Sequence, residues 1–123
     1  MNFWGKHAIV DVLGCEIKYA TDPIYIKQFV KALVKEIDMI PYGEPQVVHF
    51  ADNTDHAGWT FIQLIHTSSI VGHFLDDNGD LYLDVFSCKD FDTRDVRKVI
   101  EGFFTPKNID IRTMYRDAKE GVM

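Results

Sequence analysis

The sequence lacks most of what marks secreted and membrane-spanning proteins. It has only two cysteines, Cys15 and Cys88, which make a poor disulfide framework and fit reduced thiols better. No apolar run approaches the length of a membrane span, and no basic start followed by an apolar segment suggests a signal peptide. These absences predict a cytoplasmic protein without a membrane partner. We expect Cys15 to be a small buried hydrophobe.

Positive charge is also scarce, because 13 Lys and Arg residues stand against 19 Asp and Glu residues and the formal net charge is −6. The basic side chains are scattered, so we expect no nucleic-acid partner. The Asp and His residues of stretch 52–56 and the acids at 76–80 match no familiar ligand spacing, so we expect no metal.

Two helices are predicted in a chain of 123 residues, a length that fits a single domain over 1–123. Asp22 followed by Pro23 is a helix start, since Asp caps free N–H groups and Pro tolerates the first helical position. The apolar residues that follow recur at three- and four-residue steps, at Ile26, Phe29, Val30, Leu33 and Ile37. A second helix is predicted from Asp92 to just before Pro106.

Six stretches rich in β-branched and aromatic residues are predicted to be strands: 8–13, 46–50, 59–65, 69–75, 81–86 and 109–112. Asn78-Gly79, between the fourth and fifth, is a strong hairpin signal. The stretch 41–45 is expected to break the pattern, and the tail from Arg116 to be loose. The order predicts an α+β fold, a two-layer sandwich with a mostly antiparallel sheet and two helices on one face. The other face would be covered by a second copy, in a homodimer, or form a substrate pocket.

Three chemically capable side chains, Ser68, His73 and Cys88, fall on the predicted hairpin, where they could share one pocket or be unrelated strand residues. A serine hydrolase would need a strand-to-helix nucleophile elbow, which is absent here. A cysteine nucleophile paired with His73 stays open. So does self-processing, in which the Ser68 hydroxyl attacks the carbonyl of Thr67 and elimination of the resulting ester leaves a pyruvoyl group. Such a ketone binds an amine substrate and accepts electrons as carbon dioxide leaves.

Several motifs bear on this choice: Gly5-Lys6-His7, the stretch 10–15, Asp22-Pro23, and the spacing of Ser68, His73, Gly79 and 84–88. In these motifs the chain resembles the short bacterial and archaeal form of S-adenosylmethionine decarboxylase, a pyruvoyl enzyme of spermidine synthesis. The resemblance covers nearly the whole chain. It is sharpest in the joint spacing of Ser68, His73 and Cys88.

The resemblance implies roles for individual residues. Cleavage would fall between Thr67 and Ser68, and Ser68 would supply the pyruvoyl group. His73 would remove the Ser68 α-proton during processing, and Cys88 would reprotonate the decarboxylated carbon. Thr60 matches a family hydroxyl that helps processing.

The part of the pattern that concerns substrate recognition departs from the family. Thr67 stands where the family has Glu, Ser69 where it has His, and 73–77 reads His-Phe-Leu-Asp-Asp in place of His-Thr-Trp-Pro-Glu. The resemblance implies that Phe50 stacks on adenine and that Asp77 holds the ribose hydroxyls from one methylene further away. We expect decarboxylation of S-adenosylmethionine. Two alternatives stay open: a pyruvoyl decarboxylase of ornithine or arginine, and an unprocessed homologue that binds a ligand or partner.

Overall fold

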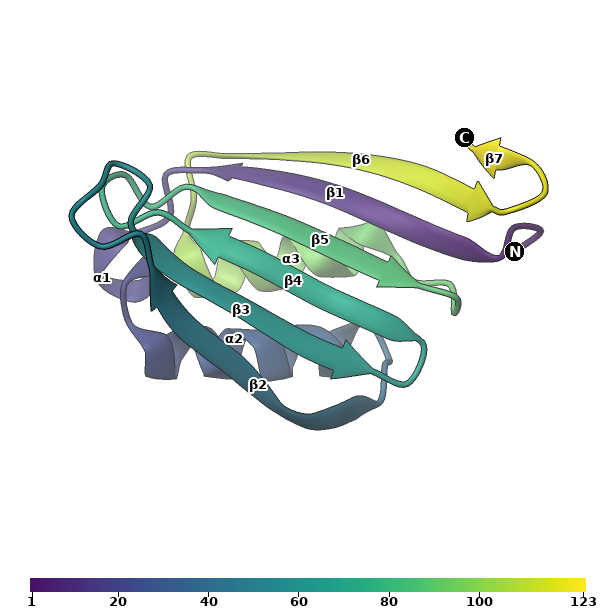
Figure 1. Cartoon of the computed structure of the whole chain (residues 1–123), viewed down its shortest axis with the longest axis horizontal. Helices are drawn as coiled ribbons and strands as arrows, with labels where there is room; N and C mark the ends of the chain where they lie inside the picture. Colours follow the sequence, from purple (N-terminus) through teal and green to yellow (C-terminus); the bar gives the residue numbers. More distant parts are fainter.

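The computed structural model describes residues 1–123 as one seven-stranded sheet with helices on one face only (Figure 1). The elements in chain order are β1 (Gly5–Leu13), α1 (Ile17–Ala20), α2 (Pro23–Glu36), β2 (Pro41–Phe50), β3 (Gly58–Ile65), β4 (Ser68–Phe74), β5 (Leu81–Ser87), α3 (Thr93–Phe104), β6 (Asn108–Asp117) and β7 (Gly121–Val122). The strand order is β2-β3-β4-β5-β1-β6-β7, and every neighbouring pair is antiparallel. The predicted α+β class and its two layers are confirmed, with the short α1 as an addition.

The two long helices begin where the sequence predicts. The side chain of Asp22 accepts hydrogen bonds from the N–H groups of Ile24 and Tyr25 at the start of α2, with Pro23 as the first helical residue. Asp92 caps α3 in the same way. The predicted apolar stripe of α2 is buried, because it lies on the sheet.

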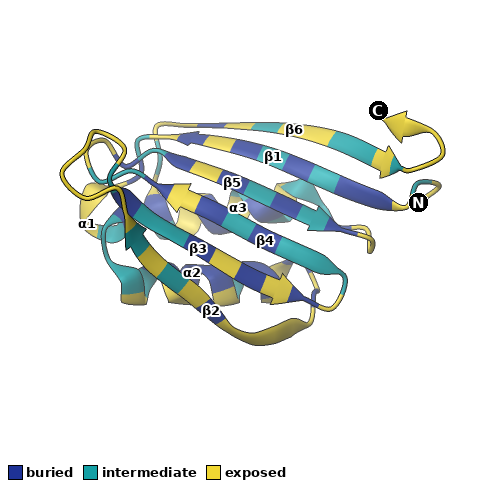
Figure 2. Ribbon diagram, in the orientation of Figure 1, coloured by how far each residue is buried: buried dark blue, intermediate teal, exposed yellow.

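The core lies between the helices and the sheet, and Figure 2 shows how buried and exposed residues alternate along the strands. Phe29 of α2 is at its centre and is fully buried. Its ring packs 4.9–6.3 Å from four other rings, those of Phe61, Phe74, Phe103 and Phe104. Cys15 is buried as predicted, and burial raises the pKa of its thiol to about 12.

The predicted β4–β5 hairpin is confirmed, and its turn depends on a glycine. Gly79 has φ +76°, and a Cβ atom there would lie 2.1 Å from the carbonyl oxygen of Cys15. A side chain is therefore excluded both by the backbone conformation and by the neighbouring chain. The hairpin fixes the register of β4 against β5.

The opposite face of the sheet carries no helix, and we call it the open face (Figure 1). It exposes apolar side chains between polar ones, among them Val48, Phe50, Ile62, Leu64 and Tyr82. No helix is long and apolar enough to cross a membrane.

Two expectations about irregular segments are wrong. The tail predicted to be loose continues β6 to Asp117 and then folds back as β7, because β6 pairs with β1 along its whole length from Leu13 to Gly5. The stretch 41–45 belongs to β2, with a register shift between Tyr42 and Gln46. An edge strand tolerates prolines, because one side of its backbone makes no ladder bonds.

Candidate functional site

The first group of predicted site residues lies where β4 begins and β5 ends. Ser68 opens β4 and pairs with Ser87, the last residue of β5, so Cys88 follows directly beside it. Cys88 is exposed and forms no disulfide. Its N–H donates a hydrogen bond to the carbonyl oxygen of Thr67 at 3.0 Å. The hairpin therefore brings Cys88 to the level of Ser68, as the sequence predicts. We call Thr67, Ser68 and Cys88 the serine end.

The backbone at Ser68 is unusual. Its φ is +156°, a positive value that residues other than glycine seldom adopt. Residues held in sparsely populated conformations cluster at active sites. This torsion directly follows the Thr67–Ser68 peptide bond, the bond at which cleavage is predicted from the sequence.

The second group of predicted residues lies at the level of the other end of β4. Thr60 of β3 pairs with His73 of β4, and Thr60 Oγ1 is 3.0 Å from His73 Nδ1. Phe50 ends β2 and is 54% exposed, and Asp77 is exposed in the turn after β4. We call these four residues the histidine end.

The length of β4 separates the two ends. Ser68 and His73 are five residues apart on one extended strand, which corresponds to roughly 16 Å. Of the three residues that could share one pocket, Cys88 lies beside Ser68, whereas His73 of the same chain lies at the other end of β4. The physical reason is that a hairpin brings together residues across strands, whereas residues along one strand stay apart.

The Gly5-Lys6-His7 motif supports the serine end from β1. The buried Lys6 ammonium lies 3.2 Å from Asp90 in the segment that follows Cys88, and this hydrogen bond lowers the pKa of the Asp90 carboxyl. His7 Nε2 lies 2.9 Å from Asp84 and joins β1 to β5. The His7 contact holds β5, which precedes Cys88, and the Lys6 contact holds the segment that follows Cys88.

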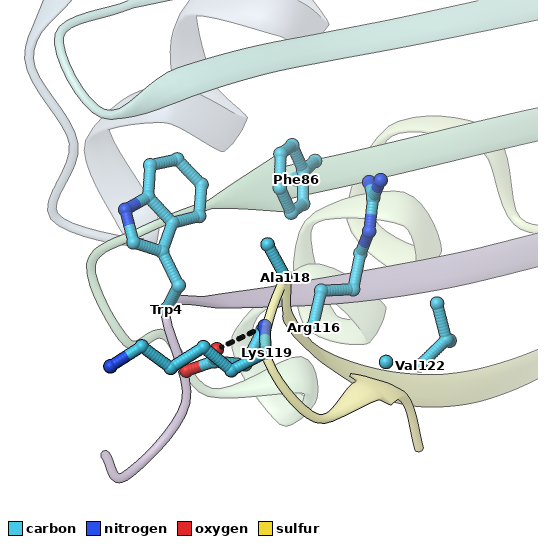
Figure 3. A pocket seen from close by; sticks show the side chains of 8 residues that line it. Trp4, Phe86, Arg116, Ala118, Lys119 and Val122 are labelled. Atoms are coloured by element: carbon cyan, nitrogen blue, oxygen red, sulfur yellow. Dashed lines mark hydrogen bonds between the residues drawn. The ribbon is translucent and has the colours of Figure 1, made fainter.

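A pocket of about 720 Å³ opens between the segment before β1, the end of β5 and the turn from β6 to β7 (Figure 3). The rings of Trp4 and Phe86 lie 5.8 Å apart, and the Arg116 guanidinium lies 4.4 Å above the Phe86 ring. Phe86 pairs with Ser69, the residue after Ser68, whereas Thr67, Ser68 and Cys88 are not among the residues that line the pocket. The fold of β7 back onto β6 supplies the rest of its lining: Asp117, Ala118, Lys119, Gly121 and Val122.

The sequence analysis missed this pocket, because it treated the tail as loose. The alternation that predicts strand 109–112 weakens beyond Arg112, and only pairing with β1 extends β6 to Asp117.

The polar stretch 52–56 is held by a histidine. His49 lies 2.5 Å from Asp52 and 2.7 Å from Asp76, through its two ring nitrogens. The hydrogen bond to Asp76, aided by the one to Asp52, raises the pKa of His49. No group of three or more His, Cys, Asp or Glu side chains is arranged to hold a metal ion. Through these two contacts His49 ties the loop after β2 to the turn after β4.

Comparison with known proteins places this geometry in a family. The family model described as S-adenosylmethionine decarboxylase matches residues 6–117. The chain belongs to this family.

Similar proteins carry the same description. The S-adenosylmethionine decarboxylase proenzymes of two Clostridium botulinum strains, Langeland and Hall, are each 25% identical to this chain over 118 residues, covering 94% of it and 97% of their own length. The crystal structure of the adenosylmethionine decarboxylase from Aquifex aeolicus VF5 has the same fold, with a TM-score of 0.78 at 22% identity and coverage of 95% of this chain and 93% of that one.

Proposed function

We propose that this chain is a self-processing decarboxylase that acts on S-adenosylmethionine through a pyruvoyl group made from Ser68. The observation that carries the proposal is the setting of the Thr67–Ser68 peptide bond. Its carbonyl oxygen accepts a hydrogen bond from the Cys88 N–H, and its serine has a positive φ. The relatives from Clostridium botulinum are described as proenzymes, which agrees with a precursor that must be cleaved.

Cleavage begins at Ser68. Its hydroxyl oxygen bonds to the Thr67 carbonyl carbon, its proton passes to the peptide nitrogen, and the carbon–nitrogen bond breaks to leave an ester. The negative charge that develops on the Thr67 oxygen faces the Cys88 N–H, which acts as a preorganised donor. Loss of the Ser68 α-proton then expels the Thr67 carboxylate. Water replaces the nitrogen, which leaves as ammonia, and a ketone remains on residue 68.

We propose that the base that removes the Ser68 α-proton is His73 of a second copy of the chain. Within one chain His73 lies roughly 16 Å from Ser68 along β4. If the twofold axis between two open faces runs across the strands, the strands of one copy run opposite to those of the other, so the histidine end of one copy meets the serine end of its partner. The exposed apolar residues of the open face fit such a homodimer. Thr60 then positions the imidazole through its hydrogen bond to His73.

A pyruvoyl ketone on residue 68 would supply the group that accepts the electron pair left on the substrate carbon when carbon dioxide leaves. Cys88 is exposed beside residue 68 and gives a proton to the substrate carbon. The pocket at Trp4 and Phe86 has the size and the aromatic lining of a small-molecule site. Phe50 and Asp77 of the second copy add the adenine and ribose contacts.

The test combines mass and turnover. Mass measurement of the purified protein should find two fragments, 1–67 and 68–123. The second fragment should begin with a pyruvoyl group. Carbon dioxide release is then measured with S-adenosylmethionine, ornithine and arginine. If carbon dioxide were released from ornithine or arginine and not from S-adenosylmethionine, the proposed substrate would be wrong. A single chain of 14.2 kDa without turnover would leave a homologue that binds a ligand or partner.

A further inference from the structure

A buried chain of hydrogen bonds holds the side chain of Thr67, the residue whose carbonyl is attacked. Thr67 Oγ1 lies 2.8 Å from Ser87 Oγ and 3.4 Å from the sulfur of Met39. Ser87 Oγ accepts a hydrogen bond from the Lys89 N–H at 2.9 Å. One arrangement uses each donor once: Lys89 N–H to Ser87, Ser87 hydroxyl to Thr67, and Thr67 hydroxyl to Met39.

The Ser87 hydroxyl of this chain lies away from water, whereas Thr67 is half-buried. Ser87 is 0% exposed and Met39 is 7% exposed. In such surroundings a hydroxyl without a partner is costly, so the hydrogen bonds hold the Thr67 side chain in one rotamer. The segment is anchored further by the Lys89 ammonium, which bonds to the Asp38 carboxylate at 3.0 Å.

Two independent contacts therefore tie Thr67 to the same segment. Its carbonyl oxygen bonds to the Cys88 N–H, and its hydroxyl bonds to Ser87. Rotation of the Thr67–Ser68 peptide plane would break the carbonyl bond, and the hydroxyl bond holds the Thr67 residue from which this plane extends. The attack of Ser68 needs this plane in one orientation, because the carbonyl carbon must face the serine oxygen while the carbonyl oxygen faces its donor.

We propose that Ser87 and Thr67 form a hydroxyl pair that positions the scissile peptide plane for self-cleavage. The inference rests on the proposed function and concerns its first step only. Ser87 is a positioning residue, since it acts through Thr67 and touches no reacting atom. The pair also accounts for the departure at position 67, because a threonine hydroxyl there is the right length to reach Ser87.

The test compares rates of self-cleavage in freshly translated or refolded precursor, followed by mass. Thr67→Val keeps the branched shape and removes the hydroxyl, whereas Thr67→Ser keeps the hydroxyl and removes the methyl group. Thr67→Val and Ser87→Ala should each slow cleavage about three- to ten-fold, the effect of one hydrogen bond. Thr67→Ser should cleave at close to the wild-type rate. The double variant, Thr67→Val with Ser87→Ala, should be no slower than either single one, because the pair acts as a unit.

The outcomes separate the two proposals. A wild-type chain that never cleaves refutes the proposed function and this inference with it. A wild-type chain that cleaves while Thr67→Val cleaves equally fast refutes only the hydroxyl pair, as do double-variant effects that simply multiply. Melting temperature is measured alongside, because a merely structural pair would lower it and leave the cleavage rate unchanged.

Discussion

The serine end and the histidine end, at opposite ends of β4, are held in different ways. At the serine end, main-chain hydrogen bonds and buried hydroxyls fix Thr67, and Ser68 has a positive φ. At the histidine end, Thr60 and His73 are partly or fully exposed and contact each other through a single hydrogen bond. In our proposal the two ends have different roles. One end holds a peptide bond ready to react, and the other presents a base on the surface of a strand, where a second copy can use it.

The largest effect is expected from the serine itself. Ser68→Ala should abolish cleavage, because no oxygen remains to attack the Thr67 carbonyl. Ser69→Ala, the matched control one residue further along β4, should cleave normally. Mass measurement of both purified proteins checks this. Fragments from Ser68→Ala would mean that another residue is the precursor of the ketone.

Cys88→Ala should separate the two functions of the serine end. Its backbone N–H remains, so cleavage should proceed, whereas turnover should fall by about 10²–10⁴-fold with the loss of the general acid. Cys15→Ala is the control, since Cys15 is buried in the core and touches neither end. Turnover is measured as carbon dioxide release from S-adenosylmethionine. A Cys88→Ala variant with unchanged turnover would exclude the thiol as proton donor.

Thr60→Val should have a smaller effect, at the histidine end. Loss of the 3.0 Å contact frees the His73 ring without removing it, so the cleavage rate should fall about two- to ten-fold, as for one hydrogen bond. Thr60→Ser keeps the hydroxyl and should retain most of the rate. If valine and serine at position 60 behave alike, the hydroxyl does not position His73.

The smallest effect concerns pH and the loop beside the histidine end. The carboxylates of Asp76 and Asp52 raise the pKa of His49 in the folded protein. The contacts between His49 and the two carboxylates therefore stabilise the folded protein fully at pH values below the ordinary histidine pKa of about 6.5. This stabilisation is lost as the pH rises through the raised pKa of His49. His49→Gln should flatten this dependence. Urea unfolding of both proteins across that range measures it, and parallel pH profiles would contradict the account.

Much of the fold could be predicted from short-range patterns. Asp22-Pro23 and the apolar stripe after it specify α2, and Asn78-Gly79 specifies the β4–β5 turn, since both signals depend on neighbouring residues alone. The C-terminal strands could not be predicted as well, because β6 gains its last residues from pairing with β1, about a hundred residues away in the chain.

The candidate site was predictable in its residues more than in its arrangement. Hydroxyl, imidazole and thiol at Ser68, His73 and Cys88 were identified from spacing, and register places Cys88 beside Ser68. The separation of Ser68 from His73 also follows from the sequence, because a predicted strand has a rise of about 3.3 Å per residue. The contacts of Thr67 with Ser87 and of Trp4 with Phe86 join distant segments and leave no signal in the sequence.

The pairing of the two ends between copies is tested most directly by mixing two inactive precursors. His73→Ala retains Ser68 and lacks the base, while Ser68→Ala retains the base and cannot be cleaved. Unfolded together and refolded as a mixture, they should yield a fragment 68–123 whose mass carries the His73→Ala substitution, although neither variant yields it alone. Cleavage of His73→Ala by itself at the wild-type rate, or none in the mixture, would contradict a site built from both ends.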